Sequence, residues 1–358
     1  MVKRFVVAMG LLLGCGLAVN ASAAVAAEQT CPTDGKMHFI CGPLGAEDLL
    51  QLADSKWMVA SGMGTGGLGP ANKDGGLYLI DTDAKTARPF YPGSAPMAQP
   101  DKALYPDCPG PPDAASYNAH GLALAPGADG ELTLLAVNHG REAVEVFDIS
   151  LKGEMPQIAW IGCVLMPPGT STNSVAALPG GGFVATKFFD PTKDKALADL
   201  MAGKISGLVY QWTPGGGFSV VPGSAMSGPN GIAVSKDGHW VYVAAFGSHE
   251  LVRLSRDGSS PERQAMGIGF APDNLRWTED GKLLVAGVNP AGPETCNGRP
   301  CPKGWTVLAW DPTAMTTTTV LSMPASSPMT GVSAATEARG YLWIGSFNDS
   351  KIGYIPAE

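Results

Sequence analysis

The sequence predicts an all-β protein, a six-bladed β-propeller with a central metal-binding channel. Three observations support this fold class: a strand pattern that recurs six times, scarce helical periodicity, and a turn-rich composition. Among 358 residues there are 47 Gly and 30 Pro, and only 16% are charged while 45% are hydrophobic. This composition allows a large core with many turns. A propeller can also use a chain of this length as one domain.

The recurring unit consists of a polar loop residue, a short alternating strand, a turn that often contains Gly with Asp, and a second strand rich in Val, Leu, Trp and Tyr. The six units begin at Ala46, Ala119, Thr172, Pro229, Pro272 and Met329. A third strand follows most of them, as in "AVEVFDIS" and "KIGYIP". Arranging such units around an axis leaves only short, protected sheet edges, which is typical of a propeller.

Two segments depart from this pattern. Residues 193–204, "KDKALADLMAGK", have the composition of a helix, and we expect them to form an insertion between strands of the third blade. The Pro-rich segment from Arg88 to Asp113 shows no alternation of its own. It is predicted to be a long loop that forms a lid or wall, or else simply covers the surface.

The first 27 residues have the pattern of a cleaved export signal: a basic start, an apolar run and small-residue A-x-A sites. We therefore predict a single propeller domain over residues 28–358 and a periplasmic or secreted protein. A lipoprotein signal ending at Cys15 is the alternative. After residue 27 no apolar run reaches the 18 or more residues that a membrane span needs.

Charge and cysteine content narrow the possible partners. Removal of Lys3 and Arg4, with no acidic residue lost, moves the net charge from −8 to −10. An acidic chain without a basic run argues against a nucleic acid partner.

After removal of the signal an even number of cysteines remains, which predicts disulfides in an oxidising compartment. Of the possible connectivities we favour the local pairs Cys31–Cys41 and Cys296–Cys301, leaving Cys108–Cys163.

Oxygen-bearing side chains recur where the innermost strands begin. In a propeller these strands line the channel, so residues at their starts converge at one end of it. Two carboxylates there would balance a divalent cation, and hard oxygen ligands suit calcium. Asn before Gly, as in "PNGIA", is also an ordinary turn residue, but recurrence at one register favours the metal. The candidate ligands are Glu47, Asn173, Asn230, Asp273 and Asn274.

Two histidines belong to the same region. His120 precedes the first strand of the second unit, and His139 ends the strand that follows. Folding the intervening residues into a hairpin places both at the same rim. We therefore expect a functional, hydrogen-bonded pair beside the metal, with two structural histidines as the alternative.

These motifs, taken in order, resemble the successive blades of the paraoxonases, which are calcium-dependent arylesterases and lactonases. The resemblance rests on "GAEDLLQL", "NAHGLAL", "VNHGREAVEVF" and "PNGIAVSKDGHWVYVAAFG", among others, and spans about residues 40–355. Gluconolactonase and strictosidine-synthase-like propellers are similar more distantly. The resemblance implies that the five oxygen-bearing residues bind a catalytic calcium and that His120 and His139 form the family's histidine dyad.

The resemblance also implies a second, structural calcium, bound by Asp48 and the backbone carbonyl of Leu122. Paraoxonases carry an aspartate where this chain has Ser174, so one charged ligand is missing. The second calcium is therefore expected to be absent or replaced by hydrogen bonding. Paraoxonases tie their N-terminal region to the C-terminus by a disulfide, whereas the tail "DSKIGYIPAE" has no cysteine. Local disulfides near residue 31 are expected to serve instead.

The resulting hypothesis is hydrolysis of a small lactone or aryl ester. Calcium would polarise the carbonyl and stabilise the oxyanion, while His120 takes a proton from the attacking water and His139 orients or relays. Asp273 could instead act as base or nucleophile in a phosphotriesterase-like reaction. A sugar-lactone hydrolase of the gluconolactonase type and a non-catalytic binding propeller are the alternatives.

Overall fold

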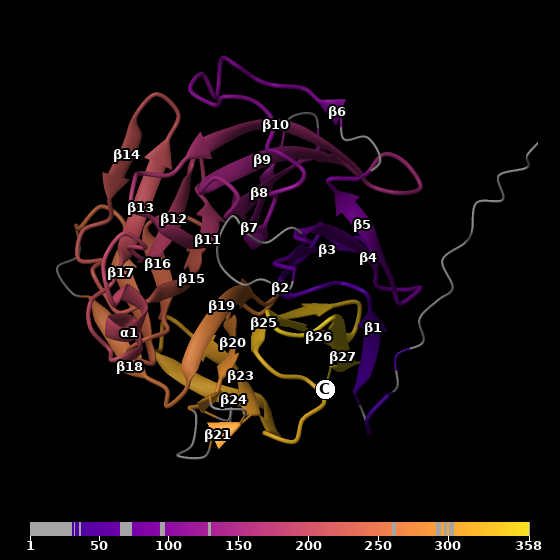
Figure 1. Cartoon of the computed structure of the whole chain (residues 1–358), viewed down its shortest axis with the longest axis vertical. Helices are drawn as coiled ribbons and strands as arrows, with labels where there is room; N and C mark the ends of the chain where they lie inside the picture. Colours follow the sequence, from indigo (N-terminus) through magenta and orange to yellow (C-terminus); the bar gives the residue numbers. More distant parts are fainter. Residues whose placement is uncertain are drawn as a thin grey trace, which may run out of the picture.

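The computed structural model describes residues 31–357 except 32, 36, 65–73, 94–96, 128–129, 260–262, 291–294, 297–298 and 301–303. Six sheets of four or five strands, antiparallel except where β6 (Met97–Ala98) pairs with β10 (Gln157–Leu165), are arranged in a ring (Figure 1). The described residues also form one small two-stranded hairpin. Strands make up nearly all of the regular structure. The six-bladed, all-β propeller predicted from the repeats is therefore confirmed.

The first three blades follow the order of the chain. The first consists of β2 (Ala46–Gln51), β3 (Trp57–Gly62), β4 (Gly76–Asp81) and β5 (Thr86–Tyr91). The second contains β7 (Ala119–Pro126), β8 (Leu132–Asn138), β9 (Ala143–Ser150) and β10 (Gln157–Leu165), with β6 (Met97–Ala98) beside β10. The third contains β11 (Ser171–Ala177), β12 (Phe183–Phe189), β13 (Leu208–Thr213) and β14 (Gly217–Val220).

The remaining blades complete the ring. The fourth consists of β15 (Pro229–Val234), β16 (Trp240–Ala245), β17 (Glu250–Ser255) and β18 (Gln264–Gly267). The fifth contains β19 (Ala271–Trp277), β20 (Leu283–Val288), β23 (Gly304–Asp311) and β24 (Thr316–Pro324), with a small hairpin of β21 (Thr295–Cys296) and β22 (Arg299–Pro300). The sixth contains β25 (Val332–Ala338), β26 (Tyr341–Ser346), β27 (Lys351–Pro356) and β1 (His38–Cys41).

The ring is closed by strand pairing between the two ends of the described chain. β1 pairs antiparallel with β27, with His38 opposite Tyr354 and Cys41 opposite Lys351. The expected disulfide Cys31–Cys41 is present and holds the segment that precedes β1. The local disulfide thus anchors the closing strand, while the backbone hydrogen bonds of β1 make the closure itself.

The segment from Arg88 to Asp113 is less irregular than predicted. β5 extends through Tyr91, and β6 pairs in parallel with β10. The prediction of a strand-free loop, made from the lack of alternation, was therefore wrong for these stretches. β5 tolerates Pro89 because it is an edge strand and needs hydrogen bonds on one side only. The expected helical insertion is confirmed as α1 (Ala196–Met201), between β12 and β13 of the third blade.

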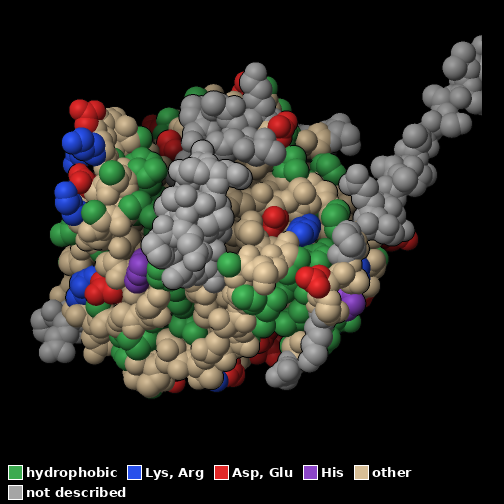
Figure 2. Space-filling model, turned by 60° about the horizontal axis from the view of Figure 1, so that its bottom comes forward, with side chains coloured by type: hydrophobic (Ala, Val, Ile, Leu, Met, Phe, Trp, Pro, Cys, Tyr) green, Lys and Arg blue, Asp and Glu red, His purple; other side chains and the backbone are tan. Residues whose placement is uncertain are grey.

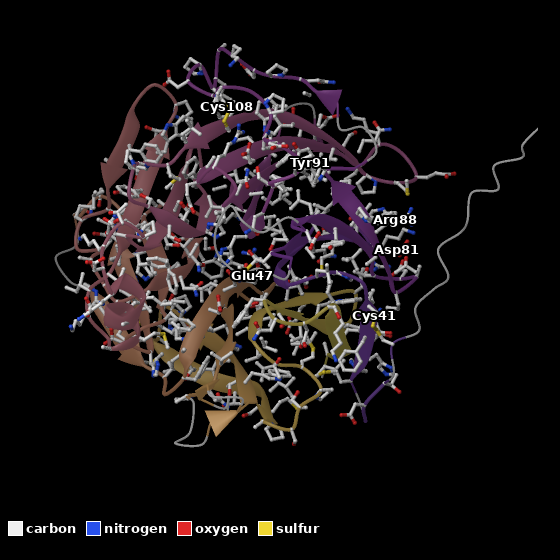
Figure 3. All side chains as sticks on the ribbon, viewed as in Figure 1. Cys41, Glu47, Asp81, Arg88, Tyr91 and Cys108 are labelled. Carbon is white, nitrogen blue, oxygen red and sulfur yellow. A yellow bond between two sulfur atoms is a disulfide. The ribbon has the colours of Figure 1, made fainter. Side chains whose placement is uncertain are left out.

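Disulfides lie at the periphery and the candidate ligands at the centre. Cys108–Cys163 is present and ties the loop after β6 to β10, whereas the predicted Cys296–Cys301 pair lies outside the described side chains. Figure 3 shows Cys41 and Cys108 near the rim of the ring and Glu47 near its centre.

The surface carries charges of both signs. On the face shown in Figure 2, acidic and basic side chains lie interspersed in small groups. The described residues include no helix that is long and apolar enough to cross a membrane. The predicted export signal, residues 1–27, lies outside the described part of the chain.

Candidate metal and histidine site

The innermost strand of every blade has an irregular register near its start. In all six, the pairing with the second strand shifts across the second or third residue, for example between Ala46 and Leu49 and between Ala119 and Leu122. Neighbouring innermost strands contact one another around the ring. Bulges re-aim side chains, so this repeated irregularity places the polar residues of each blade at one end of the channel.

Two glycines allow the innermost strands to approach closely. A Cβ on Gly121 would lie 2.5 Å from Cα of Ser174, and one on Gly231 would lie 2.3 Å from the carbonyl oxygen of Asp273. Neither glycine has a positive φ. Asn230 therefore lies in a strand, β15, and is not the turn residue considered as its alternative role. The glycine after it leaves room for the neighbouring innermost strand to approach.

The five predicted ligands share one property in the structure. Each is between 1% and 4% exposed. Each also has one buried side-chain oxygen that accepts no hydrogen bond from the described residues. Buried polar atoms almost always have partners, so five such oxygens near the starts of the innermost strands suit a hard cation. The atoms are Oε2 of Glu47, Oδ1 of Asn173, Oδ1 of Asn230, Oδ1 of Asp273 and Oδ1 of Asn274.

The electrostatics of this cluster also fit a cation. Burial, and next the charge of Asp48, raise the pKa of Glu47 well above its usual value. Burial and the charge of Glu47 do the same for the pKa of Asp273. Asn274 Nδ2 donates to Oε1 of Glu47 at 2.6 Å. The other carboxylate oxygen, Oε2, accepts no hydrogen bond from the described residues. No three His, Cys, Asp or Glu side chains among the described residues form a metal cluster, so a cation here would depend on amide oxygens.

The two histidines meet directly. His120 Nδ1 lies 2.5 Å from His139 Nε2, and His120 Nε2 lies 3.3 Å from Oε1 of Glu47. His139 Nδ1 in turn lies 2.8 Å from Oε1 of Glu142. The result is a chain of contacts that runs from Glu142 through both imidazoles to the oxygen cluster.

One pair of tautomers lets His139 hold Glu142 while Nε2 of His120 stays free to accept a proton. Where the Glu142 carboxylate is the acceptor, His139 donates from Nδ1 and accepts at Nε2. His120 must then donate from Nδ1, which leaves the lone pair of its Nε2 facing Glu47. Burial lowers the pKa of His120 to about 4 and also lowers the pKa of His139, in agreement with neutral rings.

A buried polar network holds the backbone around the two histidines. Asn138 Oδ1 accepts from the backbone N–H groups of Asn118 and Gly140, at 3.1 and 2.9 Å. Its Nδ2 donates to Glu145, which also pairs with Arg141. This one side chain therefore holds the backbone two residues before His120 to the backbone one residue after His139.

Three residues of the site were missed by sequence reasoning. Glu142 completes the histidine chain, and its spacing of three residues from His139 was an available signal. Ser333 occupies the equivalent place in the sixth blade and donates to the carbonyl oxygen of Glu47 at 2.7 Å. Arg276 contacts both groups assigned to a second calcium, the Asp48 carboxylate and the Leu122 carbonyl.

The chain belongs to the family whose model is described as the SMP-30/gluconolactonase/LRE-like region, which matches residues 71–348, more than half of the chain. This agrees with the resemblance to gluconolactonase-like propellers seen in the sequence.

Individual relatives are consistent with this family. The chain is 28% identical over 188 residues to serum paraoxonase/arylesterase 2 of Rattus norvegicus, covering 50% of this chain and 51% of that protein. It therefore spans about half the length of this curated relative. A solved gluconolactonase from Xanthomonas campestris aligns with a TM-score of 0.54 and 17% identity, over 90% of this chain and 89% of that one.

A luciferin-regenerating enzyme gives a similar alignment. Its TM-score is 0.53 at 14% identity, over 88% of this chain and 92% of that one. At these identities the two solved structures support the fold alone.

Proposed function

We propose that the protein is a calcium-dependent hydrolase of small lactones or aryl esters. The observation that carries the proposal is the side-by-side arrangement of five buried, unpartnered oxygens and a histidine pair, in which Nε2 of His120 faces the carboxylate of Glu47. The relationship to paraoxonase and gluconolactonase supports the same reaction class.

The residues divide into two groups by role. Glu47, Asp273 and the three asparagines would hold the cation, which when bound would polarise the substrate carbonyl and stabilise negative charge on its oxygen. His120 Nε2 carries the free lone pair and accepts a proton from the attacking water. The proton on His120 Nδ1 stays hydrogen-bonded to His139, which orients the base.

Glu142 acts one step further back as a positioning residue. Its Oε1 holds Nδ1 of His139, and its Oε2 accepts from the backbone N–H of Thr172 at 3.0 Å. Because Thr172 belongs to the next blade, the carboxylate is held between two blades. It thereby keeps the lone pair of His120 directed at the oxygen cluster.

A sugar-lactone hydrolase is the second candidate, since the matching family model includes gluconolactonase in its description. The 2.5 Å contact between His120 and His139 favours the paraoxonase-like reaction, because the resemblance of the sequence to paraoxonases implies a histidine dyad at these two positions. Asp273 as base or nucleophile toward phosphotriesters is a variant of the same metal chemistry. A binding propeller with a purely structural calcium predicts no turnover of any ester.

We also propose that the protein is exported. Two disulfides, Cys31–Cys41 and Cys108–Cys163, support an oxidising compartment, because cytosolic thiols are kept reduced. The export signal predicted at residues 1–27 would provide the route.

The test is a panel of aliphatic lactones, sugar lactones, aryl esters and organophosphates, assayed with calcium and with EGTA. We expect calcium-dependent hydrolysis of aliphatic lactones or aryl esters above the other classes. Preference for sugar lactones would favour the second candidate. Calcium-independent turnover, or no turnover of any substrate, would overturn the proposal.

A further inference from the structure

A single arginine side chain, Arg276, joins the innermost strands of three blades next to the candidate site. Arg276 lies in β19, two residues after Asn274, and its guanidinium donates to three backbone carbonyl oxygens: Leu49 at 2.9 Å, Leu122 at 2.8 Å and Leu275 at 3.1 Å. It also donates from Nη2 to the Asp48 carboxylate. Four of its five N–H donors are thus engaged, across the first, second and fifth blades.

These acceptors form an oxygen set of the kind that a hard cation requires. Asp48 is fully buried, and its carboxylate also accepts from the backbone N–H groups of Leu49 and Leu122, at 2.9 and 2.8 Å. No other cationic side chain contacts it in the described part of the chain. A buried charge requires a partner, and here the guanidinium fills that role.

The charge count agrees with a monovalent partner. One carboxylate, Asp48, faces one guanidinium, so the pair is neutral. Ser174, in the neighbouring innermost strand, carries no charge. A second carboxylate at that position would bring the negative charge of the pair to −2, which a divalent ion would balance. We infer that Arg276 permanently takes the place of a second metal ion, so that the protein binds one calcium and holds its inner strands together without another.

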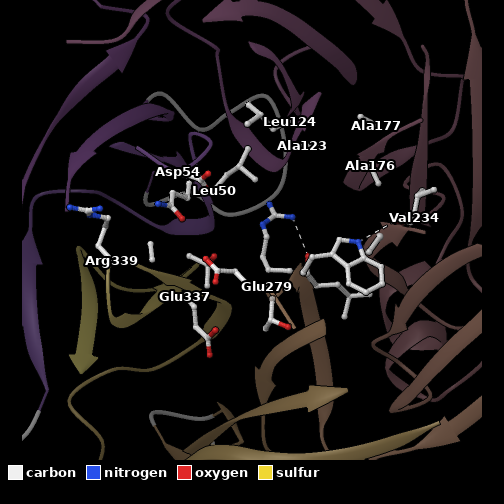
Figure 4. Close-up of a pocket in the computed structure, with 18 of the residues that line it drawn as sticks. Leu50, Asp54, Ala123, Leu124, Ala176, Ala177, Val234, Glu279, Glu337 and Arg339 are labelled. Carbon is white, nitrogen blue, oxygen red and sulfur yellow. Dashed lines mark hydrogen bonds between the residues drawn. The ribbon is translucent and has the colours of Figure 1, made fainter. Parts of the chain in front are cut away.

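Solvent reaches this arginine from the end of the channel opposite the histidines. Arg276 lines a cavity of about 720 Å³, together with residues from the later halves of the innermost strands. Figure 4 shows Asp54, Glu279, Glu337 and Arg339 around this cavity. A metal ion could therefore enter the position if the side chain were removed.

The first measurement is calcium stoichiometry in the unaltered protein, by equilibrium dialysis with elemental analysis. We expect about one calcium per chain, and a cooperative melting transition that persists in EGTA. Two calcium ions per chain would overturn the inference. No bound calcium would instead overturn the proposed function, and the variants below would then decide the role of Arg276.

The second measurement uses two variants. Arg276→Met leaves Asp48 buried without a partner, so we expect its melting temperature in EGTA to fall by about 5 °C or more. Arg276→Met combined with Ser174→Asp provides two carboxylates and a vacant position, so we expect a second calcium to bind and to restore the melting temperature in calcium only.

Arg339→Met is the matched control, because Arg339 forms an exposed ion pair with Asp83 at 3.4 Å. Its melting temperature should match that of the unaltered protein. An Arg276→Met variant as stable in EGTA as this control would overturn the inference. If Arg276→Met fails to fold while Arg339→Met folds, the structural role of Arg276 is supported, and the stoichiometry of the unaltered protein decides between one metal ion and two.

Discussion

His139 Nδ1 lies 2.8 Å from Oε1 of Glu142, although Glu142 adopts a left-handed backbone conformation with φ 47°. A non-glycine residue in this region carries strain that the surrounding structure must hold in place. The carboxylate is fixed at its other oxygen by Thr172. A carboxylate whose strained backbone is held in place beside a buried histidine is well suited to position that histidine.

Replacing Glu142 should therefore slow turnover more than it weakens substrate binding. Glu142→Ala frees His139 Nδ1, so we expect kcat to fall roughly 10-fold to 100-fold with KM little changed. Glu142→Gln keeps an acceptor and should retain more activity. Steady-state kinetics provide the measurement, with Glu131→Ala, from an exposed ion pair with Lys152, as control. Equal kinetics for Glu142→Ala and the control would remove Glu142 from the mechanism.

Replacing His120, the proposed base, should reduce turnover more than replacing Glu142 does. His120→Gln removes the lone pair that faces Glu47, and we expect lactone turnover to fall by about 10² or more. Calcium stoichiometry, measured on the same sample, should stay unchanged because His120 is not among the proposed ligands. A variant that hydrolyses lactones at the parental rate would move the base elsewhere, with Asp273 the next candidate.

Calcium removal should abolish activity reversibly. Without the cation, Glu47 and Asp273 remain buried with raised pKa values and no charge partner. We expect EGTA to eliminate hydrolysis and excess calcium to restore it, as followed by initial rates on the best substrate. Activity that persists after exhaustive chelation would contradict every version of the metal mechanism.

The close approach of the innermost strands can be tested at Gly231. A Cβ here would lie 2.3 Å from the carbonyl oxygen of Asp273, so Gly231→Ala must displace the strand that carries two proposed ligands. We expect a loss of about 1–3 kcal/mol in the free energy of unfolding, together with weaker calcium binding. Gly267→Ala is the control, since nothing lies within 4 Å of its Cβ position. Chemical denaturation and calcium titration provide the readouts.

Much of this arrangement could be predicted from the sequence because strand alternation and repeat register are local properties. The hairpins that begin at Ala46 and Ala119 were assigned correctly, and the shared register brought the ligand candidates to one level. Short outer strands such as β14 and β18 were not assigned, since they are mostly exposed and lack an alternating pattern.

The contacts that the sequence did not reveal depend on geometry that strand alternation and repeat register do not describe. Arg276 meets Asp48 across 228 positions of the chain, and only its place two residues after Asn274, in a strand that lines the channel, could have marked it. Glu142 lies only three positions after His139 and reaches it through a left-handed backbone conformation. Tertiary contact therefore assigns the role of Arg276, and local backbone geometry assigns that of Glu142.

The pairing of β1 with β27 also sets the order in which the molecule can be assembled. Among the described strands β1 is synthesised first and its partner β27 last, so the sixth blade cannot be completed until β27 has been made. The loop closed by this contact spans nearly all of the described residues, but the entropic cost of closure grows only slowly with length. Removing either terminal strand would expose an unpaired sheet edge, which is a template for aggregation. Affinity tags or truncations near either end of the chain should therefore leave residues 38–41 and 351–356 intact.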